Sequence, residues 1–362
     1  MAATEASTPP RFGLAVRLGC VASTTLIGLL AVELILRLSG VAATGRGSAW
    51  FAGGSHPRFL FVENAQAGYA LRPGFEGIEV AASGEFRVPV RIGDDGLRAA
   101  LEPPSPGRPE IVAVGDSMTF GEGVGESETW TARLESASRW RVINAGVPGY
   151  SSRQMLERLR DELGRRKPEA VLLTLSARWD LGRCSDPFVY REGYIVAASY
   201  ADRLHLVGEN LYQEAFRSRW LARPSALAMG HSALLRLALP RLAGLGGDEK
   251  ASRRSERKSR PGWPTYEPCL DALVAARSES RTRGAGFRVV LIDSPTDAFA
   301  RDTQTLRRRL AEHDVPFVAL DDWIPEGERA GLRYPKDLHW NAAGHARVAR
   351  ALRDALPEWF GK

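Results

Sequence analysis

Short apolar runs alternate with amphipathic segments from residue 110 to the end of the chain. In the amphipathic segments apolar side chains recur every three or four residues, as Met155, Leu159 and Leu163 do, which is the spacing of one helix face. This alternation of strands and helices predicts a parallel sheet with helices on both faces. The expected strands are 111–114, 141–144, 170–175, 287–293 and 317–320, and the expected helices are 126–140, 152–163, 303–313 and 341–356.

Residues 182–266 interrupt this alternation. The hydrophobic pattern predicts helices at 210–221 and 225–242, so we expect a helical insertion that covers or flanks the functional site. The stretch 252–260 is strongly basic and has no interleaved aromatic residues, which favours a solvated loop over a nucleic-acid site. The net charge of +6 over 362 residues is likewise weak support for a nucleic-acid partner.

A long apolar stretch lies at 12–38, with no charged residue between Leu18 and Val32. Because about 20 apolar residues cross a bilayer core, we interpret this stretch as a single-pass membrane anchor. Glu33 and Arg37 are spaced i,i+4 near its end and can pair at the interface. A cleaved signal peptide and a buried or interfacial helix are the alternatives. The length of the stretch disfavours the first, and the near absence of a polar face disfavours the second.

The residues that follow the anchor, 41–105, are rich in Gly and Pro. The alternating segment 86–92 and the turn sequence at 93–96 predict a β-rich lead-in with a hairpin. The length of the chain suits one α/β domain with additions. We therefore expect a tail at 1–11, a transmembrane helix at 12–38, the lead-in at 41–105 and an α/β domain at 106–360 that contains the insertion.

Two of the three cysteines, Cys184 and Cys269, lie in the main body of the chain. Neither has metal-ligand spacing around it, so we expect no metal site. If the body lies outside the cytoplasm, the two can pair as a disulfide.

A serine, a histidine and an aspartate stand where the expected strands end. Ser117 follows the strand at 111–114, and Asp337 precedes His339 by two residues after the last strand. A serine hydroxyl is a weak nucleophile that needs an adjacent base, and that base needs a group to orient it. Because the carboxyl ends of parallel strands share one edge of the sheet, these three side chains are expected to meet there.

Four sequence blocks follow one another along the chain: Gly115-Asp116-Ser117, Asn144-Ala145-Gly146, Ser176 to Asp180 and Asp337-Leu338-His339. In this order they resemble the SGNH (GDSL-type) hydrolase family, over about residues 108–356. The resemblance implies a three-layer α/β/α fold with a mainly parallel five-stranded sheet of flavodoxin-like type. The lead-in and the apolar N-terminal stretch look like those of membrane-anchored bacterial members, and the Asp–His spacing is similar to that of polysaccharide O-acetylation proteins.

Carried over to this sequence, the resemblance makes Ser117 the nucleophile, His339 the general base and then acid, and Asp337 the orienting carboxylate. The backbone N–H groups of Ser117 and Gly146 would stabilise the oxyanion, together with an Asn side chain from the third block. No cofactor or metal is implied.

The third block departs from the family pattern, because Trp179 stands where the Asn is expected. Loss of one oxyanion donor typically costs about 10²- to 10³-fold in rate. Either another donor such as Arg178 substitutes, or the enzyme is slow, or the domain has kept only a binding role. Trp179 and Trp340, which follows the base, are also candidates to line a sugar-binding cleft, although core packing is the default for most of the nine tryptophans.

The remaining candidates carry weaker signals. His345 has no aspartate partner comparable to Asp337, so His339 is the preferred base. The glycine-rich segment at 121–125 lacks the lysine of a phosphate loop, which argues against nucleotide binding. Four histidines without a partner pattern are interpreted as surface or packing residues: His56, His205, His231 and His313.

We therefore expect a serine esterase or O-acyltransferase, anchored in the inner membrane with its catalytic domain outside the cytoplasm. Its substrates would be acyl esters, acetyl above all, of envelope or secreted carbohydrate, and a multi-span acyltransferase is a conceivable partner. The alternatives are a catalytically degraded domain that binds polysaccharide or scaffolds an envelope assembly, and a lipase or thioesterase on the cytoplasmic side.

Overall fold

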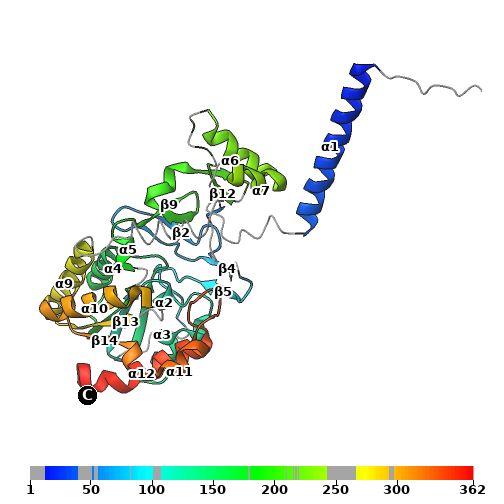
Figure 1. Ribbon diagram of the computed structural model, residues 1–362. Coiled ribbons are helices and arrows are strands. Elements are labelled where there is room, and N and C mark those ends of the chain that lie inside the picture. Colours follow the sequence, from blue (N-terminus) through cyan, green and yellow to red (C-terminus); the bar gives the residue numbers. More distant parts are fainter. Residues whose placement is uncertain are drawn as a thin grey trace, which may run out of the picture.

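The computed structural model is drawn in Figure 1. The expected tail, the basic stretch at 252–260, Arg178 and Trp179 lie outside the described residues. The structure describes residues 13–39, 51–52, 56–81, 83–100, 107–177, 180–208, 210–214, 216, 218, 220–242, 266–292 and 297–361.

A five-stranded parallel sheet forms the centre of the main domain, with strand order β14-β13-β8-β6-β7. The predicted fold class is confirmed, since this order places the first strand of the sheet between the second and third, as in flavodoxin-like folds. The strands are apolar and almost wholly buried because helices cover both faces. They are β6 (Glu110–Gly115), β7 (Arg141–Gly146), β8 (Ala170–Ser176), β13 (Gly286–Ile292) and β14 (Phe317–Ala319).

Two separate apolar cores lie on the two faces of the sheet. One core includes Met155 and Leu159 of α4 (Ser152–Arg165), Leu273 of α9 (Glu267–Thr282) and Leu306 of α10 (Asp297–Glu312). The other includes Trp130 and Leu134 of α3 (Trp130–Ser136) and Leu352 of α12 (Ala342–Phe360). Together the cores complete the three layers that Figure 1 shows.

The helix predictions needed correction mainly at helix ends. The helix expected at 126–140 is a 3₁₀ turn at Glu126–Glu128 followed by the shorter α3. The helix expected at 225–242 is two helices, α6 (Ala222–His231) and α7 (Ala233–Leu242), separated at Ser232. The helix α9 was not predicted from the sequence. Short helices α2 (Ser117–Phe120), α5 (Asp180–Arg183) and α11 (Glu326–Arg329) complete the described set.

A helical insertion had been expected at 182–266, but the part of it that the structure describes contains four strands before the helices α6 and α7. The residues predicted to start a helix at 210 instead form β12 (Asn210–Gln213), which pairs with β11 (Leu204–Val207) and with β1 (Phe51–Ala52). The neighbouring residues form a hairpin of β9 (Phe188–Arg191) and β10 (Tyr194–Ala197). Leu211 and Tyr212 are both buried in the structure, so pairing with two distant strands outweighed the local helical pattern.

The lead-in consists of two hairpins, β2 (Phe61–Asn64) with β3 (Gly68–Leu71), and β4 (Glu76–Val80) with β5 (Arg87–Arg91). The first is attached to the loop after β7 by two buried tyrosines. The hydroxyl of Tyr69 donates to Pro148 O at 2.8 Å, and the hydroxyl of Tyr150 donates to Tyr69 O at 2.6 Å. The lead-in is therefore packed onto the carboxyl edge of the sheet.

The N-terminal helix α1 (Leu14–Ser39) is long and apolar enough to cross a membrane, and none of its residues is buried. Glu33 and Arg37 pair at 2.7 Å, as their spacing suggested. The Glu33 carboxylate also accepts hydrogen bonds from Ser232 Oγ and from two backbone N–H groups at the start of α7, while Arg37 donates to His231 O. We call these contacts the anchor joint, since they tie the end of α1 to the turn between α6 and α7.

Cys184 and Cys269 form a disulfide, with their Cα atoms 5.8 Å apart. The bond joins the residue after α5 to the first turn of α9, both beneath one face of the sheet. It therefore links the start of the insertion to the residues that follow it.

Candidate active site

Ser117 lies at the carboxyl end of β6, in the first turn of α2. The Asp116 side chain caps this helix by accepting a hydrogen bond from Met118 N at 2.9 Å. A side chain at Gly115 would overlap Thr174 of β8 and Thr119 of α2, so only glycine lets the helix start this close to the sheet. The sequence Gly115-Asp116-Ser117 thus fixes the direction in which the serine points.

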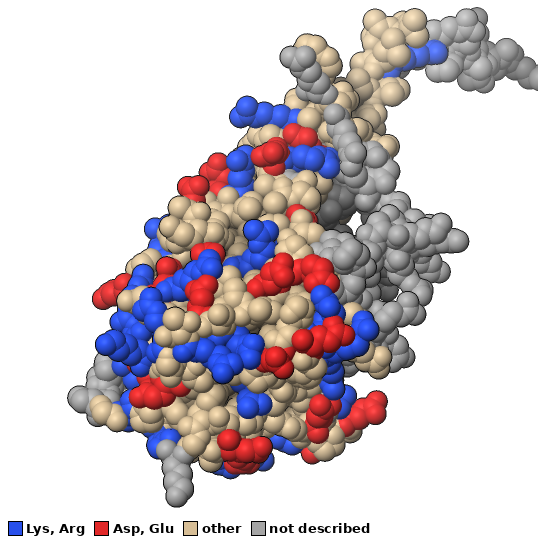
Figure 2. Space-filling model, turned by 90° about the vertical axis from the view of Figure 1, so that its left-hand side faces the viewer, with Lys and Arg blue, Asp and Glu red and all other residues tan. Residues whose placement is uncertain are grey.

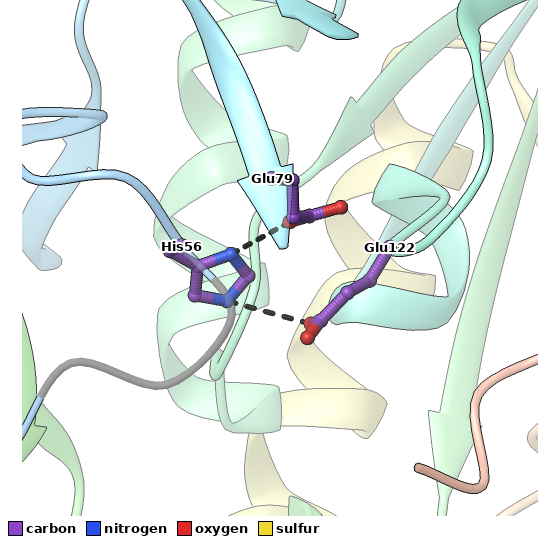
Figure 3. A group of neighbouring side chains, drawn as sticks. All are labelled: His56, Glu79 and Glu122. Atoms are coloured by element: carbon purple, nitrogen blue, oxygen red, sulfur yellow. Dashed lines mark hydrogen bonds and ion pairs between the residues drawn. The ribbon is translucent and has the colours of Figure 1, made fainter. Parts of the chain in front are cut away.

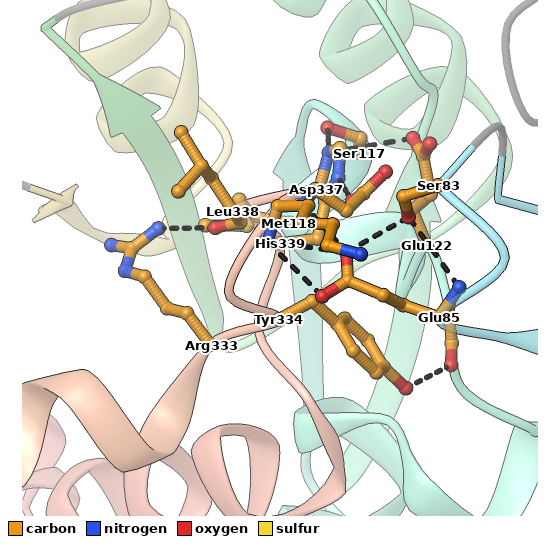
Figure 4. A network of polar contacts seen from close by, with 12 residues as sticks. Ser83, Glu85, Ser117, Met118, Glu122, Arg333, Tyr334, Asp337, Leu338 and His339 are labelled. Atoms are coloured by element: carbon orange, nitrogen blue, oxygen red, sulfur yellow. Dashed lines mark hydrogen bonds and ion pairs between the residues drawn. The ribbon is translucent and has the colours of Figure 1, made fainter.

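Ser117, His339 and Asp337 form a continuous hydrogen-bonded chain at this edge of the sheet, as Figure 4 shows. Ser117 Oγ lies 2.8 Å from His339 Nε2, and His339 Nδ1 lies 2.5 Å from Asp337 Oδ1. The residues are 222 positions apart in the chain, and the sheet brings them together. The arrangement matches what a nucleophile, a base and an orienting carboxylate require.

The loop that carries His339 is held by the lead-in (Figure 4). Glu85, between β4 and β5, accepts hydrogen bonds from the backbone N–H groups of Lys336 and Asp337. Leu338 adopts φ +74°, a left-handed conformation that is uncommon for a leucine, and its carbonyl accepts from Arg333 at 2.9 Å. These contacts hold the Asp337 and His339 side chains on the same side of the loop.

Asp116 and Asp180 form a buried pair of carboxyl groups next to Ser117, exposed by 4% and 0%. Asp180 Oδ2 accepts a hydrogen bond from Ser176 N at 2.7 Å. Burial and the charge of Asp116 raise the pKa of Asp180 well above its ordinary value. Burial therefore favours the uncharged form of Asp180, and the pair connects the end of β8 to the cap of α2.

The sequence model of the GDSL-like lipase/acylhydrolase family matches residues 113–347, which is more than half of the chain. The chain belongs to this family. No curated protein matches it significantly.

Several solved structures are similar in fold to this GDSL-like protein. The crystal structure of TesA is 16% identical with a TM-score of 0.40, covering 69% of this chain and 99% of that one. The psychrotrophic esterase EstA from Pseudoalteromonas sp. is 14% identical with a TM-score of 0.41, covering 70% and 99%. Axe2, an acetylxylan esterase from Geobacillus stearothermophilus, is 15% identical with a TM-score of 0.38, covering 70% and 94%.

The two backbone N–H groups expected to stabilise an oxyanion differ in whether they already donate a hydrogen bond in this GDSL-like protein. The backbone N–H of Ser117 has no hydrogen-bond acceptor within the described part of the chain. The N–H of Gly146 donates to Asn144 Oδ1 at 3.1 Å, and a side chain at Gly146 would overlap the backbone of α2. Gly146 thus allows α2 and β7 to pack closely, and its N–H already has a partner.

The structure places Trp340 in the core and not along the surface of a cleft. Its side chain is only 3% exposed and packs in the core with Val348 and Leu352, edge-on to His345 at 5.7 Å. His345 is also buried, accepts a hydrogen bond from Trp130 N, and has its pKa lowered to about 3 by burial. It stays neutral and serves packing, while His339 faces the serine.

The sequence interpretation missed Glu122 and His56. Glu122 Oε2 lies 3.4 Å from His339 Nε2 and 3.4 Å from His56 Nε2, and His56 Nδ1 lies 2.8 Å from Glu79 Oε1. Burial disfavours a charged His339, but Glu122 and Asp337 outweigh it and raise the pKa of this histidine to about 9. No local signal marked His56, whereas Glu122 stands five residues after Ser117 in the glycine-rich segment.

Two overlapping groups of these side chains have ligand atoms within 4.8 Å of one another and could hold a metal ion. They are His56, Glu79 and Glu122, and Glu122, Asp337 and His339. Direct hydrogen bonds and ion pairs between imidazoles and carboxylates already account for this proximity.

Replacement of Asp180 by asparagine is expected to leave the melting temperature nearly unchanged, because the neutral amide resembles the protonated carboxyl. Asp180→Ala instead leaves Ser176 N without its acceptor in a buried place, which costs about 1–3 kcal/mol in unfolding free energy. Thermal unfolding of the two variants measures the difference. A larger loss for Asp180→Asn than for Asp180→Ala would contradict a protonated Asp180.

Proposed function

We propose that the chain is a membrane-anchored serine esterase or O-acyltransferase. The observation that carries this proposal is the hydrogen-bonded chain from Ser117 through His339 to Asp337. Ser117 Oγ attacks the acyl carbonyl while His339 Nε2 accepts its proton. The same proton then goes to the leaving alcohol, and the acyl group stays on Ser117 as an ester.

The second half of the reaction returns the serine. Water or a carbohydrate hydroxyl gives its proton to His339 and attacks the acyl-enzyme, and His339 then protonates Ser117 Oγ as it leaves. Water as acceptor makes the protein an esterase, and a sugar hydroxyl makes it an acyltransferase. Asp337 stabilises the imidazolium that forms in each half.

We further propose that the catalytic domain lies outside the cytoplasm, anchored in the inner membrane by α1. The disulfide between Cys184 and Cys269 supports this location, because disulfides persist in oxidising compartments. Acetyl esters of envelope or secreted carbohydrate are then the accessible substrates. In the case of transfer, a multi-span acyltransferase would supply the acyl group. On the face in Figure 2, Lys and Arg are interspersed with Asp and Glu, an arrangement that does not favour a polyanion such as nucleic acid.

A catalytically degraded domain that binds polysaccharide is the second candidate. Trp179 at the position of the expected oxyanion Asn is the observation that favours it.

A serine-directed fluorophosphonate probe separates these candidates. The full chain in detergent is expected to take up the label and to release acetate from 4-nitrophenyl acetate, and Ser117→Ala is expected to do neither. Absence of both labelling and hydrolysis in the parent protein would favour the binding domain. Labelling that persists in Ser117→Ala would place the nucleophile elsewhere.

A further inference from the structure

Five carboxylate and imidazole side chains alternate in a row, in the order Glu79, His56, Glu122, His339 and Asp337. Figure 3 shows its first part, in which His56 lies between Glu79 and Glu122. Glu122 then lies 3.4 Å from His339, whose other nitrogen faces Asp337. The row therefore places one carboxylate on each nitrogen of the His339 ring.

The position of Glu122 is fixed from several sides. Its backbone N–H donates to Ser117 O at 3.1 Å, so Glu122 belongs to the same turn as the nucleophile. Glu79 holds the next residue through a 2.8 Å hydrogen bond from Gly123 N, and the hydroxyl of Tyr334 donates to Gly123 O at 2.8 Å. Glu79 and Glu122 are 0% and 6% exposed, so the charge of Glu122 is little screened by water.

We propose that Glu122 is a positioning residue for the acyl transfer proposed above: its carboxylate stabilises the His339 imidazolium from the Nε2 side while Asp337 does so from the Nδ1 side. This inference rests on the proposed function of Ser117. His56 and Glu79 hold Glu122 in place from the lead-in.

The chemistry of Nε2 gives Glu122 a role that Asp337 cannot fill. Nε2 is the atom that takes the proton from Ser117 and passes it to the leaving alcohol. Ser117 Oγ at 2.8 Å and Glu122 Oε2 at 3.4 Å both face this atom, so the imidazolium N–H keeps an acceptor when the serine oxygen is acylated. Glu122 therefore favours the charged histidine during the interval between proton uptake and release.

Several titratable groups besides Glu122 act on His339, and they also influence its pKa. The carboxylates favour the imidazolium, and a charged His56 opposes it, whereas His345 stays neutral. The groups are Asp337 on its own loop, Asp116 at the end of β6, His56 of the lead-in and His345 of α12.

Glu122→Gln removes the charge and keeps the shape of the side chain. An opposite charge this close shifts a pKa by about 1–3 units, so the midpoint of His339 titration is expected to fall by at least about one pH unit from its value near 9. The acid limb of kcat/KM moves down with it, and the plateau at high pH falls because the imidazolium is less stabilised. A merely structural role for Glu122 would lower the plateau and leave the midpoint in place.

The direct test is NMR titration of the full chain in detergent with ¹⁵N-labelled histidine, in the parent, Glu122→Gln and Glu63→Gln. The His339 signal, one of six, is assigned by its loss in His339→Gln. Glu63 is an exposed carboxylate of β2, and its variant should titrate like the parent. A midpoint for Glu122→Gln within about 0.3 pH units of the parent would overturn the inference. This readout does not need turnover, so it stands apart from the labelling experiment that tests the proposed function.

Discussion

Replacing His339 by alanine is expected to lower kcat for 4-nitrophenyl acetate by about 10⁴- to 10⁶-fold. His339 Nε2 lies 2.8 Å from Ser117 Oγ, and no other described imidazole contacts this oxygen. Without it, the serine keeps its proton near neutral pH and is a poor nucleophile. The rate of acetate release, compared at equal protein concentration, measures the loss.

Two variants calibrate this result. Asp337→Asn should keep the loop geometry but lower kcat by about 10³- to 10⁴-fold, because an amide neither orients the ring correctly nor stabilises its charge. His313→Ala, on an exposed histidine after α10, should leave the rate unchanged. If His339→Ala retained more than about a tenth of the parent rate, the proposed roles of Ser117 and His339 would be wrong.

Removal of the disulfide is expected to give the largest loss of stability. The bond closes a segment of 85 residues, and the loss of such a cross-link typically costs about 2–5 kcal/mol of unfolding free energy. For a chain of this size we expect the melting temperature of Cys184→Ser with Cys269→Ser to fall by about 3–7 °C. Thermal unfolding by circular dichroism gives this value.

The free and exposed Cys20 provides the control, since Cys20→Ser should melt like the parent protein. Reduction of the parent should lower its melting temperature to that of the double variant. Equal melting temperatures with and without reductant would show that the bond does not contribute to stability.

The sheet was predictable because its strands are continuous apolar runs, such as 170–175, that carry their own signal. Ser117 was predictable because its sequence block directly follows such a strand, and His339 because its block pairs it with Asp337 just ahead of the last helix. Glu122 and His56 were not, because their proximity to His339 depends on how the lead-in packs on the sheet edge. That packing is encoded in scattered contacts such as those of Tyr69 and Tyr150, which follow no local pattern.

In the insertion, the local sequence pattern predicted the wrong secondary structure. Residues 210–213 have a pattern compatible with a helix, yet they pair with strands on both sides. One of these partners, β1, comes from a segment about 160 residues earlier in the chain. Pairing with such a distant segment cannot be detected from the hydrophobic pattern of residues 210–213 and their neighbours. The burial of Trp340 was not predictable for a related reason, because its position next to His339 in the sequence does not determine which way its side chain points.

The anchor joint bears on where the protein can act. Glu33 and Arg37 bind the end of α1 to the α6–α7 turn. The main domain is therefore connected to α1 by these side-chain contacts as well as by the chain that follows α1. If α1 crosses a bilayer, these contacts would restrict the distance of Ser117 from the membrane surface and its orientation relative to that surface. Under the proposed function, an ester substrate would have to reach Ser117 at that distance from the membrane.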